Sequence, residues 1–144
     1  MATSGLAEWI GEQLAVLRGL PPLIVVLAVT AVVIFLTELT SNTATTATFL
    51  PVVAALALSL GENPLLLAAP AALAASCAFM LPVATPPNAI VFASGHLTVP
   101  QMARAGIWLN ILFVALITLI TYTLVVAAFG AEPGVVPDWA TASP

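Results

Sequence analysis

The stretch Thr40-Ser41-Asn42-Thr43-Ala44-Thr45-Thr46 interrupts apolar sequence that is long on both of its sides. The interior of a bilayer offers no hydrogen-bond partners, so hydroxyls, amides and unwound backbone persist at that depth only inside a protein or beside a wet cavity. A second interruption, Thr85-Pro86-Pro87-Asn88, lies between apolar segments about forty residues later. Two such runs in one short chain predict two halves of a single binding site.

The composition is that of a membrane protein. Of the 144 residues, 62% are hydrophobic and 6% are charged, whereas soluble globular domains carry about 25% charged residues. Charge-free runs cover 19–37, 39–61, 63–103 and 105–131, and each reaches or exceeds the roughly 20 residues that cross a bilayer. We therefore expect an all-α, multi-pass protein of the cell membrane, in contact with lipid.

The charged and reactive side chains exclude several classes of function. Arg18 and Arg104 are the only basic residues, so no basic surface is available for nucleic acid. Cys77 is the only cysteine, which excludes an intrachain disulfide and a multi-cysteine metal site. Ser41 has no neighbouring base, and the sequence contains no nucleotide-binding glycine motif. We expect neither an enzyme nor an ATP-driven pump.

The first two segments are predicted from periodicity and length. Residues 1–19 place apolar side chains at helical spacing and predict an amphipathic helix at the membrane interface. Residues 20–61 predict a hairpin with the Ser-Asn-Thr run at its tip, because a forty-residue helix would be about 60 Å long, twice the bilayer core. The arm before the tip has about eighteen apolar residues and the arm after it twelve to fourteen. The short second arm favours a re-entrant hairpin over two full spans.

Residues 62–104 predict a transmembrane helix that breaks inside the membrane and ends in an exit loop. The apolar span runs over 65–84. Pro86 and Pro87 then remove two backbone donors and disfavour helix in the residues before them. The break leaves carbonyl groups, that of Ala84 among them, without helical partners.

The C-terminal part predicts one more span. Thr98 is placed to cap the helix that follows the exit loop. Residues 105–129 predict the last transmembrane helix, long enough to cross with some tilt. Residues 130–144, rich in proline, glycine and acid, predict a disordered tail.

The tip and the break together offer the groups of an ion site. Asn42 or Thr43 can cap the second arm, whose first amides then point into the tip with the positive end of the helix dipole. The half-helix after Pro87 adds a second helix N-terminus, and two of these form an anion site without basic side chains. Carbonyls near residues 37–40 and at Ala84 suit a monovalent cation. The alternative is that both runs are solvated loops.

Three further polar side chains lie in or near apolar sequence. Glu38 has two interpretations: a proton carrier or cation neighbour, or a carboxyl group hydrogen-bonded inside the bundle. Asn110 is expected to hydrogen-bond across helices, and Trp108 to anchor the last span at the interface. His96 has no acid or cysteine nearby in sequence and is interpreted as a loop residue.

Two motifs resemble those of a known family. They are Thr37-Glu38-Leu39-Thr40-Ser41-Asn42-Thr43-Ala44-Thr45 and Leu81-Pro82-Val83-Ala84-Thr85-Pro86-Pro87-Asn88-Ala89-Ile90-Val91-Phe92-Ala93-Ser94-Gly95. The first is similar to the second Ser-Asn-Thr motif of the divalent anion:sodium symporters, and the other to their long signature. The resemblance covers residues from about 20 to about 128. Members of that family carry dicarboxylates, citrate or sulfate together with sodium.

The resemblance implies a site and a mechanism. The substrate-binding positions it implies are Ser41, Asn42, Thr43, Thr85 and Pro86. The positions it implies for a transported sodium ion, which is no prosthetic group, are Thr37, Thr40, Asn42 and Ala84. In that family the site lies between two inverted repeats and moves across the membrane, as in an elevator, against a dimeric scaffold.

The chain holds only part of what such a transporter has. A first repeat with its own Ser-Asn-Thr motif, a second sodium site and the scaffold helices are absent from the 144 residues. We therefore expect the C-terminal part of a transporter, incomplete on its own, that forms a homodimer when complete. Two alternatives remain: a small structural membrane subunit whose Ser/Thr tracts serve packing, and a proton-coupled anion permease that uses Glu38.

Overall fold

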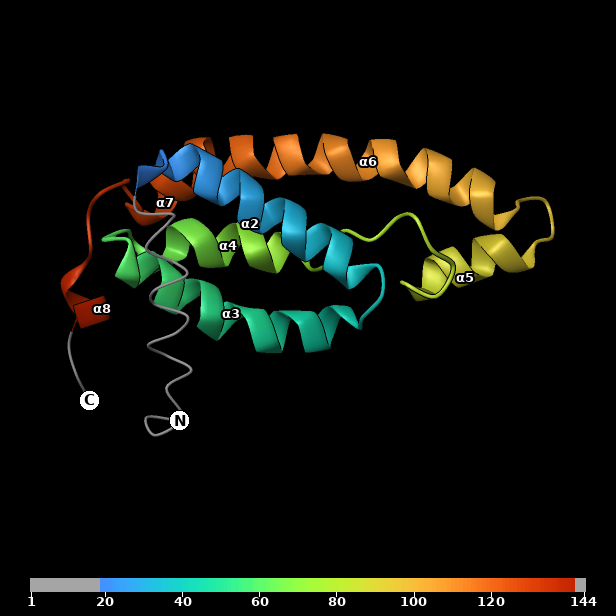
Figure 1. Ribbon diagram of the computed structural model, residues 1–144, viewed down its shortest axis with the longest axis horizontal. Coiled ribbons are helices and arrows are strands. Elements are labelled where there is room, and N and C mark those ends of the chain that lie inside the picture. The colour runs from blue at the N-terminus through green and yellow to red at the C-terminus, as the bar shows by residue number, and fades with distance from the viewer. Residues whose placement is uncertain (1–18, 142–144) are drawn as a thin grey trace.

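The computed structural model describes residues 19–141, which form a bundle of helices drawn out along one axis (Figure 1). In chain order the elements are α2 (Pro22–Thr37), α3 (Asn42–Ser59), α4 (Pro64–Ala74), α5 (Pro86–Ala93), α6 (Val99–Ile120), the π-helix η2 (Thr121–Val125), α7 (Val126–Phe129) and α8 (Asp138–Thr141). No strand occurs over this range, so the all-α prediction is confirmed there. The interfacial helix predicted for 1–19 lies, apart from Gly19, outside the described residues.

Two of the helical stretches are long and apolar enough to cross a membrane. They are Asn42–Ser59 and Val99–Phe129, the second of which joins α6, η2 and α7. Two shorter apolar helices, Pro22–Thr37 and Pro64–Ala74, lie beside them. Length and composition alone define these spans, and they agree with the composition of a membrane protein.

Helices α2 and α3 form the predicted hairpin, but their lengths differ from the prediction. α2 has 16 residues and α3 has 18, so the second arm is not the shorter one. The polar run continues the helix from Asn42 onwards, because hydroxyls such as that of Thr46 donate to a carbonyl one turn back (Asn42 O, 2.8 Å). Only residues 38–41 are non-helical. The predicted arm lengths were therefore wrong, and the observed ones do not decide between a re-entrant hairpin and two full spans.

The cap of α3 also differs from the prediction. Ser41, rather than Asn42 or Thr43, is the N-cap residue, and its side chain makes no capping hydrogen bond. Asn42 and Thr43 are the first two residues of the helix. The first amides of α3 therefore keep their hydrogens directed out of the helix end, as proposed from the sequence.

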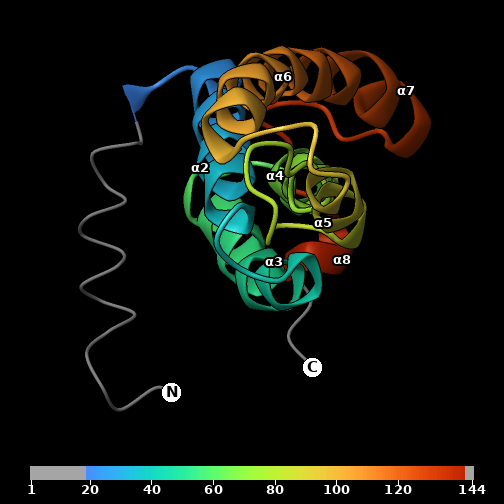
Figure 2. The ribbon, with the colours of Figure 1, turned by 90° about the vertical axis from the view of Figure 1, so that its right-hand side faces the viewer.

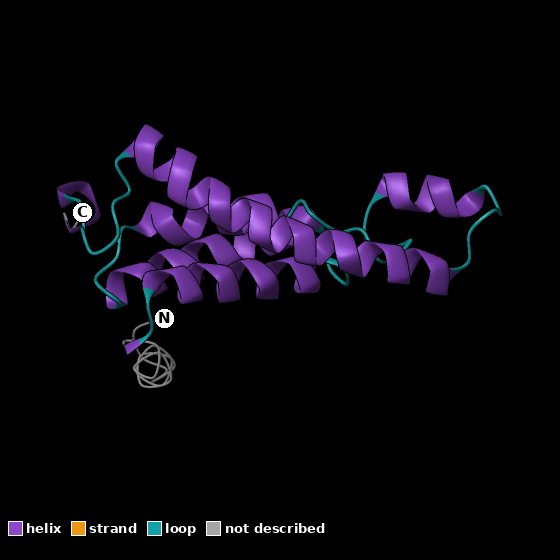
Figure 3. Ribbon diagram, turned by 90° about the horizontal axis from the view of Figure 1, so that it is seen from above, coloured by secondary structure: helices purple, strands orange, loops and turns teal. Residues whose placement is uncertain are grey.

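The break between α4 and α5 begins earlier than predicted. We expected helix as far as residue 84, whereas α4 ends at Ala74 and residues 75–85 are non-helical. α5 then continues in the same direction, so that α4 and α5 lie one beyond the other along the long axis (Figures 1 and 3). Figure 2 shows the same arrangement end-on, with α5 in front of α4. The predicted two half-helices are present, and the segment between them is longer.

The last helical stretch runs back along the whole molecule. It begins at Val99, and its N-cap residue is Thr98, as predicted. The Thr98 backbone N–H donates to Gln101 Oε1 (2.9 Å), as in a capping box. The helix continues to Phe129 and ends at Gly130, whose φ of 59° is left-handed. The apolar span that we predicted over 105–129 is the later part of this helical stretch, and the capped start before it belongs to the same helix.

The core lies where α2 meets α4 and α6. Its fully buried apolar side chains include Val26, Ile34, Leu66 and Leu67. α3 packs mainly on α4, and α6 mainly on α2. Outside this core many large apolar side chains point outward, among them Val32, Leu39, Ile90, Leu112, Leu119 and Leu124. An apolar exterior of this extent suits lipid or further protein rather than water.

The C-terminal segment makes defined contacts over 130–141, where we predicted disorder. Ala131 is buried. The backbone N–H of Gly134 donates to Glu62 Oε2 in the turn between α3 and α4 (2.6 Å). The last residues, 142–144, lie outside the described range.

Candidate functional site

One pocket lies between the hairpin turn and the break. It has a volume of about 660 Å³ and is lined by 39–43 on one wall and by 82–86 with Ala89 on the other. These are the two polar interruptions of the sequence, separated by about forty residues and brought face to face by the fold. Every expected substrate residue lines this pocket: Ser41, Asn42, Thr43, Thr85 and Pro86. Of the expected sodium positions, Thr40, Asn42 and Ala84 line it as well.

Thr37 is the expected sodium position that does not line the pocket, but it contacts Asn42, which does. Its hydroxyl is completely buried and lies 2.9 Å from Asn42 Oδ1 and 2.8 Å from the Ala75 carbonyl oxygen. The hydroxyl has one hydrogen to donate and two acceptors within reach. Three oxygens therefore converge with a single proton among them, a donor set that suits a hard cation.

The Ala75 carbonyl is a member of this oxygen cluster that the sequence did not predict. Ala75 is the first residue after α4, so its carbonyl is turned to Thr37 rather than to a helical partner. The apolar sequence around it carries no sign that the helix ends there. The contact arises only because α2 and α4 pack side by side.

Thr40 closes the turn rather than pointing freely into the pocket. Its hydroxyl donates to the Leu36 carbonyl of α2 (3.0 Å) and lies 2.6 Å from the Thr45 hydroxyl of α3. These contacts tie the end of α2 to the start of α3. A cation at this wall would therefore meet the carbonyl of Thr40 rather than its hydroxyl.

The opposite wall ends in the N-terminus of α5. Thr85 is its N-cap residue, and the Thr85 hydroxyl oxygen accepts from the backbone N–H of Asn88 (3.4 Å). The hydroxyl hydrogen remains available to a pocket ligand. Pro86 and Pro87 occupy the first helical turn, where missing backbone donors do least harm.

The pocket wall is uncharged, and its polar side chains lie mainly on the side of the turn. None of the residues that line it is acidic or basic. Positive potential at the pocket comes instead from the N-terminal ends of α3 and α5, both of which begin at the pocket wall. The arrangement is chemically suited to a small anion held by hydroxyls, the Asn42 amide and the first amides of α3, while α5 adds only the positive end of its dipole.

Glu38 lies behind the pocket and is 3% exposed. Its Oε1 accepts from the backbone N–H of Phe79 (2.7 Å) and of Met80 (3.0 Å), and its Oε2 from Met80 (3.0 Å) and Leu81 (3.1 Å). Asn110 Nδ2 donates to Oε1 as well (2.9 Å). Of the two interpretations of Glu38, this geometry is that of a carboxyl group hydrogen-bonded inside the bundle. Asn110 bonds across helices, as the sequence indicated.

The other polar residues lie away from the pocket. His96 is exposed in the loop before α6, and its backbone N–H contacts the Ser94 hydroxyl (3.4 Å). Trp108 is exposed on α6. Cys77 is half-buried, and its thiol contacts the Leu73 carbonyl (3.3 Å).

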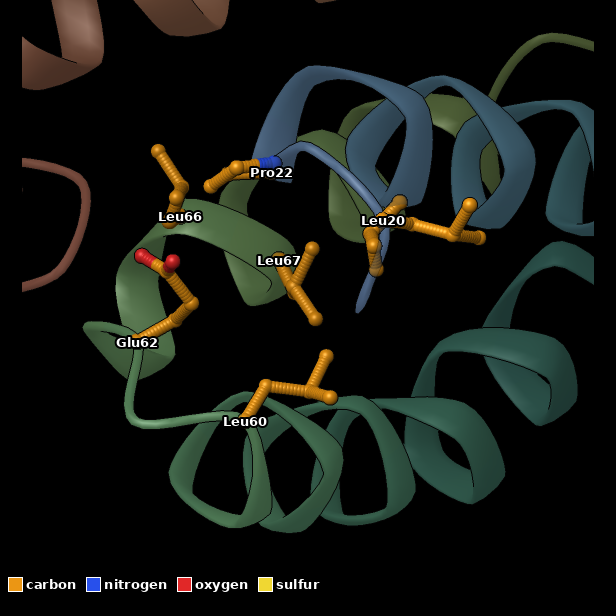
Figure 4. A pocket seen from close by; sticks show the side chains of 7 residues that line it. Leu20, Pro22, Leu60, Glu62, Leu66 and Leu67 are labelled. Carbon is orange, nitrogen blue, oxygen red and sulfur yellow. The ribbon is translucent and has the colours of Figure 1, made fainter. Parts of the chain in front are cut away.

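A second cavity, of about 250 Å³, lies at the other end of the bundle (Figure 4). The side chains that line it are apolar except that of Glu62, whose carboxylate already accepts the Gly134 N–H. The remaining lining residues are Leu20, Pro22, Val25, Leu60, Leu66 and Leu67. This cavity lacks the convergent polar groups of the first one.

Comparison with known proteins gives a family. Residues 1–128 match the family described as the sodium:sulfate symporter transmembrane region. The sodium-dependent dicarboxylate transporter SdcS of Staphylococcus saprophyticus is 50% identical over 132 residues, which are 92% of this chain and 25% of that protein. SdcS of Staphylococcus aureus strain MRSA252 is 49% identical over 132 residues, again 92% of this chain and 25% of that protein. The chain thus spans about a quarter of the length of these curated relatives.

Proposed function

Because this chain belongs to the sodium:sulfate symporter family, we propose that it carries one half of the substrate site of a sodium-coupled anion transporter. The observation that carries the proposal is the pocket between the hairpin turn and the break, which gathers all the expected substrate positions. The names of the relatives favour dicarboxylates over citrate or sulfate as the anion.

The substrate carboxylates are bound by the polar groups of both walls. Ser41, Asn42 and Thr43 supply hydroxyls and an amide from the turn, and Thr85 with Pro86 forms the facing wall. The ends of α3 and α5 add the positive potential that basic side chains would otherwise provide. Ser41 and Thr43 are exposed to the pocket, which supports a binding role over a packing role.

Sodium is bound next to the substrate by oxygens of Thr37, Thr40, Asn42 and Ala84. The cluster of Thr37 Oγ1, Asn42 Oδ1 and the Ala75 carbonyl supports a cation at this position. Asn42 belongs to both sets, so a bound cation offsets the charge of the anion and raises its affinity. By linkage the anion raises the affinity for sodium to the same extent.

The complete transporter contains further parts. The hairpin is re-entrant, the interfacial helix precedes it, and a first repeat supplies the other half of the substrate site. α5 buries no residue, and Ile90 is 72% exposed, which supports contact with these missing parts. The complete protein is a homodimer whose site-bearing domain moves as an elevator.

Two alternatives are less well supported. A structural subunit would fill its Ser/Thr tracts with packing contacts, whereas the polar side chains here line a pocket of about 660 Å³. A proton-coupled permease would need Glu38 to take up and release a proton. Every hydrogen bond to its carboxylate comes from an N–H donor, which supports a structural acceptor rather than a proton carrier.

The proposal is tested by uptake into proteoliposomes that contain the full-length transporter carrying this chain. We expect uptake of a four-carbon dicarboxylate to require sodium and to be abolished by Asn42→Ala. Thr123→Ala is the matched control, because the Thr123 hydroxyl contacts only carbonyls of its own helix (Leu119 O, 2.9 Å). Equal uptake with sodium replaced by choline would contradict the coupling.

Accessibility measurements separate a binding site from packing. Cysteines placed at positions 41 and 85, with Cys77 changed to serine, should react with a water-soluble thiol reagent. Dicarboxylate plus sodium should protect both cysteines, and either ion alone should protect them less. Labelling that ignores both ions would favour the structural subunit.

A further inference from the structure

The break between α4 and α5 has an unusual set of partners for its backbone. Residues 75–85 have left the helix, and a buried backbone group without a partner is strongly unfavourable. Three consecutive N–H groups, those of Phe79, Met80 and Leu81, donate to the single carboxylate of Glu38. These residues lie 41 to 43 positions away from Glu38 in the chain.

The carbonyl groups of the break are held in the same way. Asn88 Nδ2 donates to the carbonyls of Ala78 and Leu81, both at 3.0 Å. The Thr37 hydroxyl donates a hydrogen bond to the carbonyl of Ala75. The break is therefore a fixed structure whose hydrogen bonds come from side chains of α5 and of the end of α2, rather than a loose linker.

Helix α6 supports the break from the other side. Asn110 Nδ2 donates to Glu38 Oε1, and Gly106, one turn earlier on the same face, lies directly against the backbone of the break. A Cβ atom on Gly106 would lie 2.5 Å from the Phe79 carbonyl oxygen and 2.6 Å from the Met80 Cα. Backbone contact at this distance is possible only with glycine.

These contacts link the two walls of the pocket through one charged group. Glu38 begins the turn that forms the first wall, and it directly follows Thr37. The amides that it holds lie shortly before Ala84 and Thr85, which form the second wall. The carboxylate does not line the pocket. It therefore joins the two walls from outside the pocket.

We propose that Glu38 is a positioning residue that sets the separation of the two pocket walls and thereby the affinity for sodium. Asn110 orients its carboxylate, and Gly106 lets α6 approach the break closely. The proposal rests on the proposed function for the identity of the cation. In structural terms it stands independently, because the carboxylate is the acceptor for three backbone N–H groups of the break.

The first test needs no variant. Hydrogen exchange of the full-length transporter in detergent, resolved to single amides by fragmentation, should show Phe79, Met80 and Leu81 protected as strongly as α2. Amides of the exposed loop before α6, such as that of Leu97, should exchange fast. Fast exchange at 79–81 would overturn the proposal, whatever the transport assay shows.

The second test uses Glu38→Gln in the uptake assay. The glutamine amide keeps the shape but turns an NH₂ group toward backbone donors. We expect the sodium concentration for half-maximal uptake to rise about tenfold, as expected for the loss of one hydrogen bond to a charged group. Uptake at saturating sodium should change much less, and the dependence of uptake on pH should stay that of the unmodified transporter.

The matched control is Glu62→Gln, because the Glu62 carboxylate also accepts a hydrogen bond from a backbone N–H and lies away from the pocket. This variant should leave the sodium dependence unchanged. Asn110→Ala should raise the half-saturating sodium concentration in the same direction as Glu38→Gln but less, and it provides the readout if Glu38→Gln does not fold.

Two outcomes overturn the proposal in the uptake assay. One is unchanged sodium dependence in both Glu38→Gln and Asn110→Ala. The other is a pH-dependent uptake that Glu38→Gln makes independent of pH at unchanged sodium affinity, which would identify a proton carrier. An unmodified transporter without sodium-dependent uptake would refute the proposed function instead, and the exchange measurement would still decide the role of Glu38.

Discussion

The hairpin turn and the break are both interruptions of apolar helix, yet they are stabilised in opposite ways. The turn, residues 38–41, is short, and apart from Glu38 its side-chain contacts reach partners four or five residues away, as Thr40 does with Leu36 and Thr45. The break, residues 75–85, depends on Glu38 and Asn88, and Glu38 is oriented by Asn110, 72 residues away. A turn built from local contacts tolerates change, whereas a break held by remote partners fails when any of those partners moves.

Gly106→Ala should have the largest effect, because the added methyl group would collide with backbone atoms of the break. The added Cβ would lie 2.5 Å from the Phe79 carbonyl oxygen, so α6 or the break must shift. We expect a loss of more than about 3 kcal/mol in stability, at the upper end of overpacking effects, together with loss of sodium-dependent uptake. Thermal unfolding monitored in detergent, with uptake in parallel, measures both.

Gly19→Ala is the control for this prediction. A Cβ at Gly19 has no atom within 4 Å, and its φ is not in the left-handed region. Its unfolding temperature should match that of the unmodified protein. Equal behaviour of the two variants would show that α6 and the break do not touch as described.

Asn88→Ala should have the next largest effect, again through the break. It removes both donors to the carbonyls of Ala78 and Leu81. Two half-buried acceptors lose their partners, and we expect a destabilisation of about 1–3 kcal/mol. Hydrogen exchange should increase over 78–85 and stay unchanged in α3. A uniform increase over both regions would mean that the break is not a separate unit.

Thr37→Val tests the contact between the two regions. Valine keeps the shape but removes the hydrogen that Asn42 Oδ1 and the Ala75 carbonyl share. We expect the half-saturating sodium concentration to rise about tenfold, since one ligand oxygen is lost. The maximal rate of uptake should change less. A drop in the maximal rate at unchanged sodium affinity would argue against a cation at this position.

Thr46→Val should have the smallest effect, because it acts on the turn side through a local contact. The Thr46 hydroxyl donates to the Asn42 carbonyl within the same helix. Such a bond adds little to a carbonyl that already has a helical partner, so we expect a change below about 0.5 kcal/mol in stability. A change as large as that of Asn88→Ala would remove the distinction between local and remote stabilisation.

The same difference explains what the sequence could predict. The positions of the two interruptions followed from local features, the Ser/Thr run at 40–46 and the prolines at 86 and 87. The structure places the turn and the residues before Pro86 at one pocket. The N-cap at Thr98 followed from its own neighbours and was confirmed.

The extent of the break could not be predicted, because its cause is not local. Residues 75–81 are apolar except Ser76 and contain no proline or glycine, so nothing local predicts that the helix ends there. Their helix is replaced by hydrogen bonds to Glu38, Asn88 and Thr37, which the chain brings near only after folding. The lengths of the hairpin arms were mispredicted for a related reason: hydropathy counted Asn42 and the following threonines as turn, although their hydroxyls bond within α3.

The carboxylate of Glu38 also limits how the cargo can leave. To open a gap between the turn and the break, the protein would have to strip a buried anion of its N–H donors, which costs several kcal/mol. Moving the turn and the break together as one rigid body keeps every one of these bonds. Release of the bound ions is thus expected to occur when the whole assembly changes its surroundings, with its internal geometry preserved.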